Sequence, residues 1–106
     1  MVAKEIITEA TKILADAAHP LKIILFGSYA QGKQTEESDV DLLVIERELS
    51  NKLDEMVRLR RLLRPLRIPV DVLVYSEEEV REWGHLPGTT LYWALQEGKV
   101  LHEAAS

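Results

Sequence analysis

The sequence predicts an α+β fold in which helices lie against a small central sheet. Two observations predict this fold. Apolar residues recur every three or four positions in several segments, which is typical of amphipathic helices. Short apolar runs rich in β-branched residues separate these segments and are typical of buried strands. A chain of 106 residues has room for one core, so we expect residues 1–106 to form a single domain.

The first predicted helix spans residues 3–18 and ends at His19-Pro20, since a residue before proline avoids helical backbone angles. The first strand, 21–27, ends at Gly27. The second strand, 40–46, is apolar on both alternating faces, as expected of a central strand with helices on both sides. Strand pairing directions cannot be read from these patterns.

Ser50 is the expected N-cap of a helix that Pro65 should end, and the third strand follows at 69–75. Ser76 and Glu79 have the spacing of a capping box, so a helix should start there and break near Gly84. The last helix, 89–98, is expected to end with Gly98 as a left-handed cap. Residues 99–103 then predict a short edge strand.

Composition limits the possible functions. Thirteen basic against eighteen acidic residues give a net charge of −5, which disfavours direct nucleic-acid binding and means that any bound phosphate needs a local device. There is no cysteine, which excludes disulfides, thiolate zinc sites and cysteine nucleophiles and fits a cytoplasmic protein. No apolar run approaches the ~20 residues of a membrane span, and we expect neither a signal peptide nor a membrane partner.

Residues 27–41, GSYAQGKQTEESDVD, contain two patterns that suggest other chemistry. Gly27 to Lys33 satisfies the phosphate-loop pattern GxxxxGK, but Gln34 stands where the magnesium-binding hydroxyl should follow. The Asp39-x-Asp41 pair also suggests a calcium loop or a phosphatase aspartate pair. A calcium loop needs glycine at its sixth position, and in the phosphatase pattern the apolar strand precedes the aspartates, whereas here it follows them.

Another interpretation accounts for more of this segment. Gly27 and Ser28 lie where a strand passes into a helix, so phosphate oxygens could approach free backbone amides and a hydroxyl there. Asp39 and Asp41 are two residues apart at the start of a strand, so their side chains should share one face. Carboxylates, waters and substrate phosphates together suit Mg²⁺. Asp71 begins the next strand and would be a third carboxylate if the two strands are neighbours.

Plainer interpretations stay open for the same residues. An aspartate at the entrance of a strand is often only solvated, which applies to Asp71 more than to the pair Asp39 and Asp41. Ser28 could be a helix cap and nothing more. Three carboxylates with a phosphate cradle nevertheless describe a site for metal-assisted phosphoryl or nucleotidyl transfer.

Gly27-Ser28, ten intervening residues and Asp39-x-Asp41 resemble the signature of the DNA polymerase β-like nucleotidyltransferase superfamily. The wording FGSYAQG followed by SDVDLLV is most similar to the minimal nucleotidyltransferases, single-domain antitoxins encoded beside HEPN-domain toxins. The resemblance covers nearly the whole chain and implies the nucleotidyltransferase fold, with a small mixed sheet and flanking helices.

The resemblance also implies roles for individual residues. Gly27 and Ser28 would bind the nucleotide triphosphate, and Asp39 and Asp41 would bind two Mg²⁺ ions. Asp71 would complete the metal site and help to activate the attacking hydroxyl. The implied reaction transfers AMP from ATP to a tyrosine of a partner HEPN toxin, in a hetero-oligomer, and releases pyrophosphate.

The sequence departs from relatives in two ways. Gln31 stands where relatives often carry a basic residue, and whether Lys33 replaces that residue is open. Larger superfamily members also add a domain that holds the base and the acceptor, so we expect a partner protein to supply acceptor specificity here. A non-catalytic module that neutralises its partner by occlusion is the alternative function.

Two further surfaces are candidates for contacts. Residues 57–67 hold five arginines and no acid, and could face an acidic partner, RNA, the nucleotide or only solvent. Several aromatic and leucine side chains near the C-terminus form a candidate docking surface, although core packing would explain them equally. These are Trp83, Leu86, Leu91, Tyr92 and Trp93. The sequence does not reveal the nucleotide used, the modified residue, the number of AMP groups or the oligomeric state.

Overall fold

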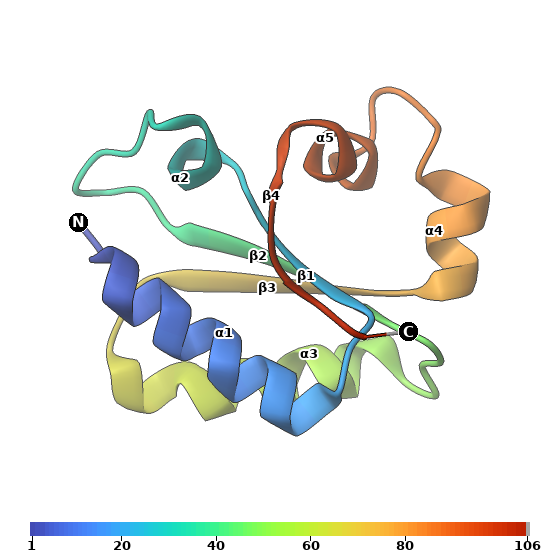
Figure 1. Ribbon diagram of the computed structural model, residues 1–106, viewed down its shortest axis with the longest axis horizontal. Helices are drawn as coiled ribbons and strands as arrows, with labels where there is room; N and C mark the ends of the chain where they lie inside the picture. The colour runs from blue at the N-terminus through green and yellow to red at the C-terminus, as the bar shows by residue number, and fades with distance from the viewer. Residues whose placement is uncertain (106) are drawn as a thin grey trace.

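A computed structural model describes residues 1–105 and contains a four-stranded sheet with helices on both faces (Figure 1). The strands lie in the order β3-β2-β1-β4, with β1 at Lys22–Phe26, β2 at Val40–Glu46, β3 at Val70–Ser76 and β4 at Lys99–Glu103. β1 is antiparallel to both β2 and β4, whereas β2 and β3 are parallel. The sheet is therefore mixed, which confirms the predicted α+β fold.

Side chains of the central strands alternate between two cores. Leu42 and Val44 of β2 pack with α1, Lys4–Ala18, and α3, Lys52–Leu63, on the lower face in Figure 1. Leu43 and Ile45 pack with α5, Thr90–Glu97, on the upper face. This confirms that β2 is a central strand covered on both sides, as its continuous apolar sequence predicts.

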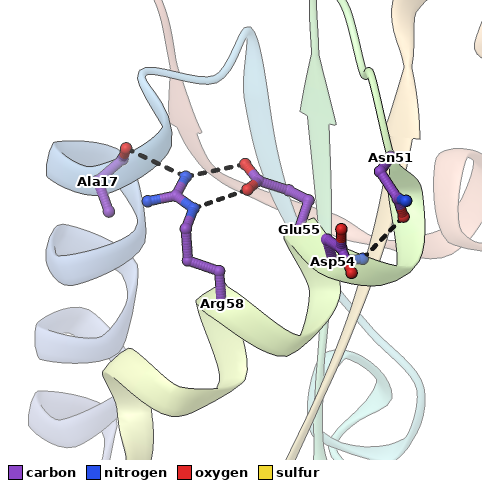
Figure 2. A network of polar contacts seen from close by, with 5 residues as sticks. All are labelled: Ala17, Asn51, Asp54, Glu55 and Arg58. Carbon is purple, nitrogen blue, oxygen red and sulfur yellow. Dashed lines mark hydrogen bonds and ion pairs between the residues drawn. The ribbon is translucent and has the colours of Figure 1, made fainter.

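α3 begins one residue later than expected. Asn51, not Ser50, has the extended backbone of a cap, and its side chain accepts a hydrogen bond from the Asp54 amide at 3.0 Å (Figure 2). Ser and Asn cap helices about equally well, so the sequence could not decide between the two neighbours. After Leu63 the chain continues as a 3₁₀ turn, η1, at Arg64–Leu66, which contains the helix-ending Pro65.

Arg58 of α3 connects this helix to α1. Its guanidinium donates to the Glu55 carboxylate at 2.7 and 2.9 Å and to the carbonyl of Ala17 at 3.3 Å (Figure 2). Ala17 lies in the last turn of α1, where carbonyls lack intrahelical partners. Arg58 is thus used in the packing of the two helices under the sheet.

The C-terminal third follows the predicted order. Ser76 and Glu79 form the capping box at the start of α4, Glu77–Trp83, which ends at Gly84 as expected. The prediction of a left-handed cap at Gly98 is wrong, because Gly98 has φ −74°. Glycine is needed there for close packing, since a Cβ atom would lie 2.9 Å from the carbonyl oxygen of Leu25.

β1 and β3 differ from the predicted strands by one residue at their ends. β4 is the expected edge strand and pairs with β1 alone. In the part of the chain that the structure describes, no helix is long and apolar enough to cross a membrane.

Candidate active site

Three strands bring the predicted site residues to one end of the sheet. In the antiparallel pair β1 and β2, Phe26 lies opposite Asp41, so Gly27 follows at the edge of the site. In the parallel pair β2 and β3, Asp41 lies beside Asp71. Asp39 immediately precedes β2. The strands that bear the aspartates are therefore neighbours, which was the condition for Asp71 to join Asp39 and Asp41.

Strand alternation sets the face on which these aspartates lie. Leu42 and Val72 are in the lower core, so Asp41 and Asp71 are on the upper face, the face that α4 and α5 cover farther along the strands. Asp39 is exposed, and Asp41 and Asp71 are half-buried. The starts of β2 and β3 lie below α2 in Figure 1, at the end of the sheet away from α4. The carboxylates are thus held on rigid strands while solvent reaches them.

The electrostatics of Asp41 indicate that the three carboxylates interact. Burial raises the pKa of Asp41, and the negative charges of Asp71 and then Asp39 raise it further. Arg60 of α3 forms an ion pair with Asp71 and also donates to the carbonyl of Val72 at 3.3 Å. Sequence analysis placed Arg60 only within a basic segment, because nothing local shows which arginine turns toward β3.

The donor set fits a hard cation that also binds substrate. Among residues 1–105, no group of three or more His, Asp or Glu side chains is placed so that it could hold a metal ion. Mg²⁺ needs only one or two protein carboxylates when substrate phosphates and waters complete its octahedron. Asp41, half-buried beside two other negative charges, provides oxygen ligands and a local potential that favours a cation.

Gly27 has a backbone conformation that only glycine adopts readily, with φ 74° and ψ −155°. A Cβ atom added at position 27 would overlap the carboxylate of Asp41 and would lie 3.2 Å from Asp41 Cγ. α2, Ser28–Gln31, starts directly after this residue. Glycine at position 27 therefore lets the backbone approach the Asp41 carboxylate closely.

The start of α2 presents backbone donors beside Asp41. The amides of Ala30 and Gln31 donate to the carbonyl of Gly27 at 3.1 and 3.3 Å. Within residues 1–105, the amides of Ser28 and Tyr29 have no protein acceptor. Free amides at a helix start suit an anionic oxygen.

The structure excludes the phosphate-loop interpretation. A phosphate loop requires a helix that begins at its Lys-Ser or Lys-Thr step. Here α2 ends at Gln31, Gly32 caps it with φ 70°, and residues 33–39 form no helix. Lys33 therefore follows the short helix instead of starting a long one.

A cavity of about 260 Å³ lies next to Gly27, between α2 and α5. At its rim, Gln31 Nε2 donates to Glu97 Oε2 at 2.8 Å. Nothing in the sequence indicates that Glu97 lies beside Gln31, since the two residues are 66 positions apart. The half-exposed ring of Trp93 lines the same cavity, whereas Leu91 is in the core. The aromatic segment near the C-terminus thus divides between core and surface.

Fold and site together define the class of a nucleotidyltransferase, and the family comparison gives the same result. Residues 8–105 match the family described as Polymerase beta, Nucleotidyltransferase. A Methanocaldococcus jannaschii protein named as a protein adenylyltransferase, MJ0604, is 37% identical over 87 residues, which cover 76% of this chain and 77% of that protein. The chain belongs to the polymerase β nucleotidyltransferase family and is a nucleotidyltransferase.

A second protein of this organism with the same description, MJ1379, is 56% identical over 41 residues, which cover 39% of this chain and 41% of that protein. A solved structure described as a nucleotidyltransferase from Sulfolobus solfataricus shares the fold, with a TM-score of 0.64, 22% identity and coverage of 93% of this chain and 78% of its own. A structure described as a toxin-antitoxin with AMP-PNP also has a TM-score of 0.64, at 24% identity, and covers 92% and 73%. The likeness extends over nearly all of the described chain.

Proposed function

We propose that this nucleotidyltransferase transfers AMP from ATP to a tyrosine hydroxyl of a partner HEPN toxin and thereby acts as an antitoxin. The observation that carries the proposal is the register of Asp41 beside Asp71, with Gly27 packed against the Asp41 carboxylate. Relatives named as protein adenylyltransferases support AMP as the transferred group and a protein as the acceptor. A structural neighbour described as a toxin-antitoxin with AMP-PNP supports the toxin partner and the nucleotide.

Each residue has a defined part in this proposal. Asp39 and Asp41, with Asp71, would hold Mg²⁺, and the free amides after Gly27 together with the Ser28 hydroxyl would bind the triphosphate. A bound Mg²⁺ would supply positive charge to the phosphates and favour ionisation of the acceptor hydroxyl. The tyrosine oxygen attacks the α-phosphorus, the bond from this phosphorus to the bridging oxygen breaks, and pyrophosphate leaves. Asp71 lies at the edge of the site, where it can help to remove the hydroxyl proton.

The proposal includes a cytoplasmic location, which rests on the absence of cysteine from the sequence. A hetero-oligomer with the toxin is also part of it. The chain would then provide the catalytic core, and the partner would provide the surface that selects one hydroxyl.

One observation favours a second function. Arg60 is paired with Asp71 and so neutralises one of the three carboxylates. If that pairing persists when nucleotide is present, the chain could neutralise its partner by occlusion without transfer. The two functions differ in whether Asp39 and Asp41 are needed.

The test is intact-protein mass spectrometry of the co-purified partner after incubation with ATP and Mg²⁺. The wild-type chain is compared with an Asp39→Asn, Asp41→Asn double variant and with the control Asp16→Asn, whose side chain is exposed on α1. We expect whole AMP increments on the partner with wild type and with the control, and none with the double variant. A bound but unmodified partner in all three samples would instead establish occlusion.

A further inference from the structure

Three arginines near the end of α3 form a charged surface that the rest of the molecule does not neutralise. Arg61, Arg64 and Arg67, hereafter the arginine patch, are all exposed. The ion pairs found within residues 1–105 use Arg58 and Arg60 of this segment and none of the patch. The chain as a whole has a net charge of −5, so the patch is a positively charged region on a negatively charged protein.

The arginine patch lies beside the candidate active site. Arg60, which directly precedes Arg61, reaches Asp71. Arg67 lies two residues before Pro69, whose carbonyl accepts the amide of Val40 at 2.8 Å. Val40 stands between Asp39 and Asp41. In Figure 1 the chain rises from the end of α3, below the sheet, to the start of β3.

Exposed apolar side chains adjoin the arginine patch on the same helix. Val57 is 48% exposed and Leu62 is 38% exposed. Together with Arg61, Arg58 and Asp54 they line a surface hollow of about 530 Å³ along α3. A surface that combines guanidinium groups with aliphatic side chains suits a peptide that has both carboxylates and apolar residues, because arginine binds carboxylates in a bidentate manner.

The same surface is poorly suited to nucleic acid. Single-stranded RNA and DNA are bound through aromatic side chains that stack on the bases, together with extended positive grooves. No aromatic residue occurs from Arg47 to Val74, the segment that contains the whole of α3 and η1. The negative charge of the remaining chain would also repel a long polyanion.

We propose that the arginine patch docks an acidic segment of the protein acceptor and thereby brings its hydroxyl to Asp41 and Asp71. This inference rests on the proposed function, because it assumes that the acceptor is a protein. It adds that acceptors are selected by carboxylates close to the modified hydroxyl. The patch acts in binding and leaves the reacting atoms to the aspartates.

The test uses a fluorescein-labelled synthetic peptide with one tyrosine flanked by glutamates, and the same peptide with glutamines in their place. Binding is measured by fluorescence anisotropy without ATP, at several salt concentrations. The variant carries Arg61→Gln, Arg64→Gln and Arg67→Gln. The charge-matched control carries Lys12→Gln, Arg47→Gln and Arg81→Gln, three exposed basic residues outside the patch and outside the ion pairs of the described chain.

We expect the glutamate peptide to bind wild type more tightly than the glutamine peptide does, with affinity that falls as salt rises. The patch variant should lose at least about fivefold in affinity for the glutamate peptide, and the control variant less than about twofold. Circular dichroism establishes that both variants fold.

Several results would overturn the inference: equal losses in the two variants, equal binding of the two peptides, or no binding of either. Stronger binding of a single-stranded RNA of similar length, lost in the patch variant, would assign the surface to nucleic acid instead. Transfer is measured separately, with ATP labelled at the α-phosphate. Tight, patch-dependent binding without any transfer would uphold docking and count against the proposed reaction.

Discussion

Strand β2 has an acidic cluster at each of its ends, and the two clusters are neutralised in different ways. At the end of β2, Glu46 meets Glu55 of α3, and Arg58 donates two hydrogen bonds to Glu55. At the start of β2, Asp41 faces Asp71 and Asp39. We call Glu46 and Glu55, which lie beside Arg58, the closed cluster. We call Asp39, Asp41 and Asp71 the open cluster.

The closed cluster places one guanidinium beside two carboxylates, although the buried Oε2 of Glu46 has no hydrogen-bond partner among the described residues. Burial, a hydrogen bond with Glu55 and the charge of Glu55 raise the pKa of Glu46 to about 8. The hydrogen bond from Arg58 is the main cause that lowers the pKa of Glu55. At neutral pH the pair therefore holds one proton and one negative charge, with a guanidinium beside it. Through Glu46, Glu55 and Arg58, this cluster joins β2, α3 and α1.

The open cluster is less fully neutralised. Arg60 pairs with Asp71, but the causes that act on the pKa of Asp41 are burial and two negative charges. Gly27 lets the backbone lie close to the Asp41 carboxylate, where a Cβ atom would overlap it. The comparison teaches that a raised pKa does not by itself identify a functional carboxylate. Glu46 has a large shift and lies beside Glu55 and Arg58, whereas Asp41 lies beside two further carboxylates.

The largest predicted effect separates the two clusters by activity. Asp41→Asn should lower AMP transfer by about 10³-fold, because a metal-binding carboxylate contributes several kcal/mol to stabilising the transition state. Glu46→Gln should leave transfer within about twofold, since Glu46 lies at the end of β2 opposite to Asp41. The assay is release of pyrophosphate with the partner as acceptor. Equal losses in the two variants would show that the difference between the two ends of β2 is not functional.

The next effect concerns the close approach of Gly27 to the Asp41 carboxylate. Gly27→Ala should lower the free energy of unfolding by about 1–3 kcal/mol, because its conformation excludes other residues, and should also abolish nucleotide binding. Gly32→Ala is the matched control. Its φ is also positive, at 70°, but a Cβ atom added there would have nothing within 4 Å. We expect it to cost about 1 kcal/mol of stability and to keep nucleotide binding, as measured by urea unfolding and nucleotide titration.

Retained nucleotide binding in Gly27→Ala would show that the Asp41 carboxylate can move away from the new methyl group. In that case the glycine would serve the backbone turn alone. A loss of binding in both glycine variants would instead point to the conformation of α2 as the requirement.

The open cluster was predictable from the sequence, and the closed one was not. Asp39 and Asp41 lie two residues apart, and Gly27 precedes a short helix, so local spacing identifies all three. Glu46 and Glu55 are separated by a turn and part of a helix, and only the packing of α3 under the sheet brings them together. Local patterns show which residues share a strand, but not which helix side chains reach it.

The same distinction applies to the fold. Capping at Ser76 and the limits of β2 depend on adjacent residues and were predicted correctly. A Cβ atom at Gly98 would meet the carbonyl of Leu25 in β1 as well as that of Ala94 in its own helix, and the pairing of Gln31 with Glu97 joins segments far apart in the chain. The pairing of Arg60 with Asp71 joins α3 to β3, eleven positions apart in the chain. Such tertiary contacts have no local signal.

The third prediction concerns the pH dependence of stability. The folded-state pKa of Glu46, about 8, lies above its ordinary value of 4.5. Its favourable contribution is therefore complete below pH 4.5 and is lost as pH rises through about 8. Glu46→Gln carries no charge to bury, so it should be more stable than wild type at pH 9 and similar to it at pH 4.5. Urea unfolding at intervals across this range measures the difference, and parallel stability curves would contradict the assignment.

The smallest predicted effect tests why Arg60 is at the open end. Arg60 and Asp71 have side chains that are 44% and 45% exposed, so their ion pair should contribute less than about 1 kcal/mol to stability. Its positive charge nevertheless competes with a cation for Asp71. Arg60→Gln should therefore lower the Mg²⁺ concentration needed for half-maximal nucleotide binding by about fivefold, which corresponds to about 1 kcal/mol for one charge at contact distance in water. Arg58→Gln is the control, because Arg58 serves the closed cluster and should not change the Mg²⁺ requirement. A higher Mg²⁺ requirement in Arg60→Gln would mean that Arg60 orients Asp71 for metal binding. Arg58 and Arg60 would then have the same role, since each would hold a carboxylate in place.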